Sequence, residues 1–403
     1  MAPADLHAKY LVEAVSAALH HKPIPKPDFP FDPELFLRLV SDQHLSTLLY
    51  PAFKSSEGIL PDEAAEKLRR DCRLDQQRAA EQEDALEELT EAFSAQKIRF
   101  LALKGIVLKR YYDKPSYRMM GDLDLLIEPE NRARARDIME SLGYRTASYG
   151  EMYDDVYFRR PFLEVELHVA LGRPEDYSDE RFATLWDRAA FSPEKPCFGE
   201  LSPVDYYLYF LLHAAKHFRG RGTGVRTVID LWCLKERFLP ALDRAQLDIE
   251  LEKFGMLTFE RELTALCEAW FDRGEAEGFF GEPMLRFLIL DGGLYGNEEN
   301  AFFKHTVEDG DVSQAHANKR KLFLRRIFPT RENMAVRYPV LDKHPWLLPF
   351  FWFWRILRTL VRPDKVQGEA RLYRKVSDGM DLQTELRERF GLLPENNSGE
   401  DRG

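Results

Sequence analysis

Cysteine is scarce in this sequence. The four cysteines among its 403 residues are Cys72, Cys197, Cys233 and Cys267. They lie far apart and form no Cys-x-x-Cys pair, so the sequence offers neither the ligand spacing of a zinc knuckle nor a disulfide framework. We therefore expect buried thiols in a reducing compartment and a cytoplasmic protein.

Basic charge and long apolar runs are also lacking. The formal net charge is −11, whereas broad, non-specific binding of nucleic acid needs a basic surface that releases phosphate counterions. The longest apolar run, Pro345 to Trp354, is too short to span a bilayer. No basic segment followed by an apolar one opens the sequence, so we expect no secretory signal. We therefore expect no broad nucleic-acid binding and no transmembrane segment.

Proline and glycine are absent from Asp62 to Lys97. Apolar residues recur there at spacings of three, four or seven, which is typical of a long helix with one apolar stripe. The stripe consists of Leu68, Cys72, Ala79, Leu86, Leu89 and Phe93. We predict an N-terminal helical region over residues 1–97.

The period changes after this helix. A compact apolar run, Phe100 to Leu103, ends at Lys104 and Gly105, and a helical pattern follows. This order predicts a strand, a glycine turn and a helix. The N–H groups at the start of such a helix can bind a nucleotide phosphate.

Two carboxylates interrupt the next predicted strand, Gly121 to Ile127. Alternation places Asp122 and Asp124 on the same face. Two like charges a few ångströms apart repel each other, so a divalent cation that neutralises them is the expected reason for the pair. A strand end whose aspartates simply face water is the alternative.

A further predicted strand, Phe162 to Leu171, also alternates. Glu164, Glu166 and His168 share its polar face. As an antiparallel neighbour with this face toward the two aspartates, the strand would supply a third carboxylate. Such an oxygen-rich site suits Mg²⁺, which prefers carboxylates and substrate phosphates, and it indicates phosphoryl or nucleotidyl transfer.

The chain beyond Pro203 is mostly helical by pattern. His213 and His217 stand four residues apart on one predicted helix. We expect them to be partly buried rather than zinc ligands, because no Glu-x-x-His motif or nearby cysteine supports zinc. Arg226 and Asp230 have the same spacing on the next helix, where an ion pair is the simplest expectation.

Several of these motifs occur together, in the same order, in one protein family. They are the Leu103–Gly105 turn, Arg118, the Gly121–Leu126 strand and the Glu164–His168 strand. In them the chain resembles the bacterial, uncharacterised nucleotidyltransferases of the DNA polymerase β-like superfamily. The resemblance covers roughly residues 60–360.

The resemblance implies an α+β fold, in which helical regions flank a core made of a small mixed sheet with helices. It implies that Asp122, Asp124 and Glu166 are both catalytic and metal-binding, with Mg²⁺ or Mn²⁺ as the cation. The expected nucleotide-binding residues are Lys104, Gly105, Arg118 and Lys216. The expected reaction moves an NMP from an NTP, with ATP as the first candidate, to an unknown acceptor hydroxyl or phosphate and releases pyrophosphate.

Some positions keep alternatives open. The turn reads Gly105-Ile106 where the superfamily usually has Gly-Gly or Gly-Ser, and the third acid is glutamate where aspartate is usual. Glu164 could replace Glu166, and Arg118 could pair with one of the aspartates instead of a phosphate. A nucleotide-binding or scaffold module of the same fold, with little or no turnover, is the alternative to an enzyme.

The domain organisation expected from these patterns has four parts. The N-terminal helical region is followed by a nucleotidyltransferase core over residues 98–200, a helical domain over 201–335 and a C-terminal region over 336–403. Within the last part, Trp346 to Arg362 mixes aromatic residues with arginines. This segment is expected either to lie on a membrane surface or to cover a core or contact a partner.

Overall fold

The computed structural model describes residues 2–56, 58–161, 163–172, 180–220, 222–291, 327–331, 334, 338, 340–360 and 382–392. The chain divides into two compact units, one of residues 1–215 with 223–294 and one of residues 216–222 with 295–403. Within the described ranges, no helix has the length and apolar character needed to cross a membrane. The four-part division expected from the sequence stays a prediction.

Four helices open the first unit. They are α1 (Pro3–Leu19), α2 (Pro33–Asp42), α3 (Ser46–Lys54) and α4 (Asp62–Ala95). The 34 residues of α4 confirm the long helix expected from the stretch without proline or glycine. Phe93 near its end is fully buried and packs edge-on against Phe100, with 5.2 Å between the ring centroids. This end of α4 therefore packs on the sheet.

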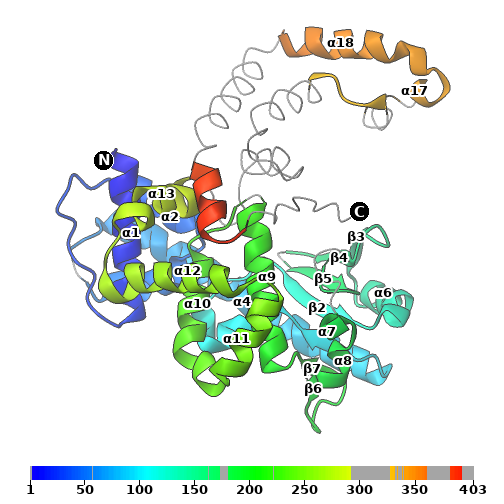
Figure 1. The fold of residues 1–403 in the computed structure, drawn as a ribbon, viewed down its shortest axis with the longest axis horizontal. Coiled ribbons are helices and arrows are strands. Elements are labelled where there is room, and N and C mark those ends of the chain that lie inside the picture. Colours follow the sequence, from blue (N-terminus) through cyan, green and yellow to red (C-terminus); the bar gives the residue numbers. More distant parts are fainter. Residues whose placement is uncertain are drawn as a thin grey trace, which may run out of the picture. The chain divides into compact units, whose positions relative to one another are not determined.

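A seven-stranded sheet forms the core of the first unit, in the order β3-β4-β5-β2-β1-β7-β6. The strands are β1 (Phe100–Ala102), β2 (Leu123–Ile127), β3 (Arg145–Ser148), β4 (Asp154–Arg159), β5 (Leu163–His168), β6 (Ala190–Phe191) and β7 (Phe198–Glu200). The pairs β1–β7 and β2–β5 are parallel and the other pairs antiparallel. A mixed sheet flanked by helices confirms the expected α+β class (Figure 1).

The direction of β5 corrects one expectation. β5 runs parallel to β2, so the antiparallel pairing predicted for it is wrong. A parallel pair needs a long crossover connection, and helix α6 (Arg132–Ser141) with the β3–β4 hairpin supplies it. Side chains alternate in either direction, and the register still sets Asp124 beside Glu166.

The remaining helices complete both units. They are α5 (Lys104–Leu108), α7 (Glu180–Ala183), α8 (Leu185–Arg188), α9 (Pro203–Arg219), α10 (Arg226–Arg237), α11 (Arg244–Lys253), α12 (Leu257–Cys267), α13 (Glu282–Leu285), α17 (Val340–Lys343) and α18 (Leu348–Leu360). In Figure 1, α1, α2, α12 and α13 lie together at one side of the first unit and the strands at the other. The last turn of α9 and the helices α17 and α18 belong to the second unit.

Candidate functional site

Asp124 is a charged residue in the middle of the sheet. All five residues of β2 are buried, and the side chain of Asp124 is only 3% exposed. A carboxylate in such a place must be compensated by partners. Lys104 Nζ lies 2.5 Å and His168 Nε2 2.9 Å from the same atom, Asp124 Oδ1. Two groups on different elements thus converge on one buried oxygen.

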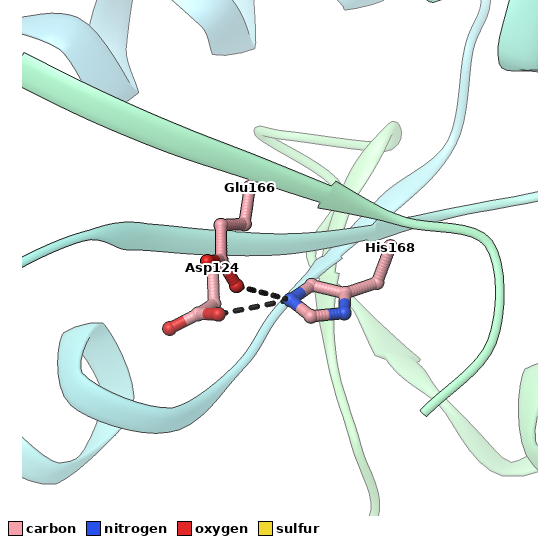
Figure 2. A group of neighbouring side chains, drawn as sticks. All are labelled: Asp124, Glu166 and His168. Atoms are coloured by element: carbon pink, nitrogen blue, oxygen red, sulfur yellow. Dashed lines mark hydrogen bonds and ion pairs between the residues drawn. The ribbon is translucent and has the colours of Figure 1, made fainter. Parts of the chain in front are cut away.

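Glu166 comes from the neighbouring strand and joins the same cluster. Its Oε2 lies 3.4 Å from His168 Nε2 and 3.8 Å from Lys104 Nζ. Figure 2 shows the His168 ring directed at both carboxylates. One ligand atom each of Asp124, Glu166 and His168 fall within 4.8 Å of one another, close enough to share a metal ion. The register of β2 and β5 is what brings them together.

Charge interactions distinguish the two aspartates. The Asp124 charge, followed by burial, raises the pKa of the Asp122 carboxyl to about 7. Burial would also raise the pKa of Asp124, but Lys104 and His168 hold it well below its usual range. Burial would lower the pKa of Lys104, but Asp124 raises it well above its usual range, so this ammonium stays charged. Asp122 is thus the carboxylate left without full compensation.

Lys104 reaches Asp124 from an uncommon backbone conformation. Its φ is +43°, a region that residues other than glycine seldom adopt. The hydroxyl of Tyr206 on α9 donates to the Lys104 carbonyl at 3.2 Å, while the ammonium binds Asp124. Strained residues of this kind cluster at functional sites. The turn after β1 therefore holds Lys104 over the carboxylates.

The donor set of this cluster fits a hard divalent cation. Asp124 and Glu166 offer carboxylate oxygens, the ligands that Mg²⁺ and Mn²⁺ prefer. Asp122, expected from the sequence as a further ligand, is not in the group of described residues whose ligand atoms lie within 4.8 Å of one another. His168 Nδ1 is buried and has no hydrogen-bond partner in the described part of the chain. A histidine that binds a metal almost always donates its other ring N–H to an acceptor. His168 is therefore better suited to donate from Nε2 to the two carboxylates than to bind the metal.

A comparison with known families agrees with this geometry. The model of a family described as uncharacterised nucleotidyltransferase matches residues 30–272, which is more than half of the chain. The chain belongs to this nucleotidyltransferase family. No curated protein and no solved structure matches it. The match supports a transferase role in general, and it spans β1 to β7 together with α9 and α10.

In this member of the family Arg118 forms a buried ion pair. Its Nε and Nη2 donate to the two carboxylate oxygens of Asp230 at 2.7 and 2.9 Å, and the Tyr112 hydroxyl donates to the same carboxylate at 2.7 Å. The sequence left open whether Arg118 binds a phosphate or pairs with Asp122 or Asp124. The observed partner is Asp230 on α10, which joins the loop before β2 to the helical part of the unit.

Asp230 also corrects the ion pair expected within α10. Its carboxylate receives Arg118 and Tyr112, whereas Arg226 donates to the carbonyl of Met119 at 2.6 Å. Helical spacing alone indicated Arg226 as the partner. The sequence gives no local signal for Arg118, because the two residues of the actual pair lie 112 positions apart.

Gly105 is buried inside α5 rather than free in a turn. A Cβ at this position would lie 2.7 Å from both Arg118 Nη1 and Met120 Sδ. Close packing therefore requires glycine here. The sequence had suggested a different reason for this glycine, namely a contact between its backbone and a phosphate. That contact stays a prediction.

Lys216 lies near the end of α9, in the part of the helix that belongs to the second unit. Its expected contact with the triphosphate stays a prediction. His213 and His217 on the same helix are both partly buried, as expected. Sequence reasoning missed the roles of His168 and Asp230. Alternation had already placed His168 on the face of Glu166, so that signal was present.

Proposed function

We propose that this protein transfers a nucleoside monophosphate from an NTP, with ATP as the first candidate, to an acceptor hydroxyl or phosphate. In this reaction the acceptor oxygen bonds to the α-phosphorus, the bond between the α-phosphorus and the bridging oxygen breaks, and pyrophosphate leaves with the electron pair. Membership of the nucleotidyltransferase family supports the class of reaction.

One observation carries the proposal. Asp124 and Glu166 stand side by side on parallel strands, and the Asp124 charge together with burial raises the pKa of a second aspartate, Asp122, to about 7. Carboxylates this close repel one another, and a bound divalent cation would relieve that repulsion. Asp122, Asp124 and Glu166 would hold the divalent cation. When bound, it would neutralise the charge that develops on the triphosphate.

The other residues have separate roles in this proposal. Glu166 is partly exposed, so it can accept the proton of the acceptor hydroxyl as the new bond forms. His168 donates to Asp124 and Glu166 and fixes their orientation. Lys104 would contact the phosphates, as the superfamily resemblance implies for this position.

The test uses NTPs labelled at the α-phosphate, incubated with the purified protein and a cell extract. We expect one molecule of the extract to acquire label in the presence of Mg²⁺. Asp122→Asn and Asp124→Asn should each lower the rate by about a hundredfold or more, because the metal site loses a charged ligand. The matched control is Asp137→Asn, an exposed aspartate of α6, which should label at the wild-type rate. Unchanged labelling in both site variants would refute the metal assignment.

A second candidate, a nucleotide-binding module without turnover, is favoured by the contact between Lys104 and Asp124. A lysine 2.5 Å from the buried acid neutralises it without any metal, as a permanent structural ion pair would. Calorimetry with ATP and Mg²⁺ separates the two candidates. Metal-dependent ATP binding without label transfer would select the module, and no binding at all would exclude both.

A further inference from the structure

Helix α18 carries apolar side chains on two faces, and one of these faces is packed. The Phe351 ring lies 4.4 Å from that of Tyr338, and the Trp352 ring lies 5.4 Å from that of Phe328. Trp352 Nε1 also donates to the Pro329 carbonyl at 2.9 Å. These contacts anchor one face of α18 within the second unit.

The other face of α18 and the turn before it is apolar and exposed. Trp346 is 74% exposed, Phe350 58%, Phe353 64%, Trp354 49% and Leu357 43%. These positions follow the spacing i, i+4, i+7, i+8 and i+11, which places them along a single stripe of the helix. Large aromatic residues gathered in this way mark a surface that binds a partner or a membrane.

Charge around this stripe indicates the kind of partner. The sequence from Lys343 to Pro363 contains no aspartate or glutamate, although the whole chain has a net charge of −11. The basic residues of this segment are Lys343, Arg355, Arg358 and Arg362. Tryptophan and phenylalanine on one face, with lysine and arginine beside them, are typical of helices that lie in a membrane interface.

We propose that the exposed stripe of α18 docks this protein on a membrane surface rich in anionic lipids. The helix has 13 residues, which suits a position in the interface plane and not a crossing of the bilayer. A second copy of the chain is the competing occupant, and dimerisation through the stripe would bury the same aromatic residues in both copies. The proposal does not depend on nucleotidyl transfer.

Vesicle flotation tests the proposal with the full-length protein. We expect binding to phosphatidylcholine vesicles that contain phosphatidylglycerol, and at least tenfold weaker binding to vesicles of phosphatidylcholine alone. The double variant Trp346→Glu/Phe353→Glu should bind at least tenfold more weakly than wild type. The matched control is Ile249→Glu, because Ile249 on α11 is 68% exposed and lies outside the stripe. This control should bind like wild type.

Further readouts keep the test independent of any one variant. In the wild type, brominated lipids should quench part of the tryptophan fluorescence, since Trp346 and Trp354 would enter the interface. Asp122→Asn/Asp124→Asn should bind vesicles like wild type, which separates this proposal from the proposed reaction. Absent flotation, flotation that the double variant leaves unchanged, or a wild-type dimer that the double variant abolishes would each overturn the proposal.

Discussion

Asp124 is the buried centre of the candidate site, where its carboxylate accepts hydrogen bonds from both Lys104 and His168. Alternation along the strands was enough to predict that Asp122 and Asp124 share a face and that Glu166 and His168 share another. The contact between Lys104 and Asp124 could not be predicted in this way. It depends on a positive φ in the turn after β1 and on the position of α9, which are tertiary features.

Two glutamates of β5, Glu164 and Glu166, are candidates for the third carboxylate of the proposed metal site, and a comparison of their variants identifies which one it is. Glu166 pairs in register with Asp124, whereas Glu164 lies two residues earlier on the same face. We expect Glu166→Gln to lower the rate of label transfer about a hundredfold and Glu164→Gln to lower it by less than about fivefold, because only Glu166 lies beside Asp124. Steady-state rates at saturating Mg²⁺ measure both variants. A larger loss in Glu164→Gln would reverse the assignment.

The raised pKa of Asp122 predicts a pH dependence of stability. The native state holds the Asp122 proton up to about pH 7, whereas an unfolded aspartate loses it near pH 4. The stabilisation is therefore fully present below about pH 4 and is lost as the pH rises toward 7. In metal-free buffer, the free energy of unfolding of wild type relative to Asp122→Asn should fall over this range.

Urea denaturation at several pH values, with EDTA present, measures this difference. His168 also has a raised pKa, because its hydrogen bonds to Asp124 and Glu166 outweigh the lowering by burial. That contribution is present in both proteins and largely cancels in the comparison. A difference that stays constant from about pH 4 to 7 would contradict the raised Asp122 pKa.

At the scale of elements, the sequence predicted the long helix and several strands, but it did not predict β4, β6 and β7 or how the strands pair. The long helix α4 and the strands β1, β2 and β5 lie where periodicity predicted them. The parallel direction of β5 was missed because alternation is the same in both directions. The pairing of Arg118 with Asp230 was missed because it joins a loop to a helix far along the chain.

This ion pair predicts a stability effect between elements. Arg118→Met should lower the free energy of unfolding by about 3–5 kcal/mol, because Asp230 is left buried without its counter-charge. The control is Arg110→Gln, which removes the exposed pair between Arg110 and Glu200 and should cost less than about 1 kcal/mol. Urea denaturation compares the two variants. An equal loss in both would show that the buried pair does not brace the unit.

At the scale of the whole molecule, the two units differ in what they contribute. The family match ends at residue 272 and lies almost wholly in the first unit, which carries the carboxylates. The second unit lies mostly beyond that match and carries the exposed stripe of α18. A few motif residues were enough to predict the nucleotidyltransferase family, but not the acceptor, because the contacts that select an acceptor follow no local pattern.

We propose that Asp122, Asp124 and Glu166 serve transfer of the nucleoside monophosphate and not transfer of the γ-phosphate. The most direct measurement incubates the protein and Mg²⁺ with the extract fraction that contains the acceptor. ATP is supplied with its label at either the α- or the γ-phosphate. We expect that only the α-label enters the acceptor, that the γ-label leaves in pyrophosphate, and that Asp124→Asn abolishes both events. Entry of the γ-label alone, or α-label transfer that survives Asp124→Asn, would contradict the proposal.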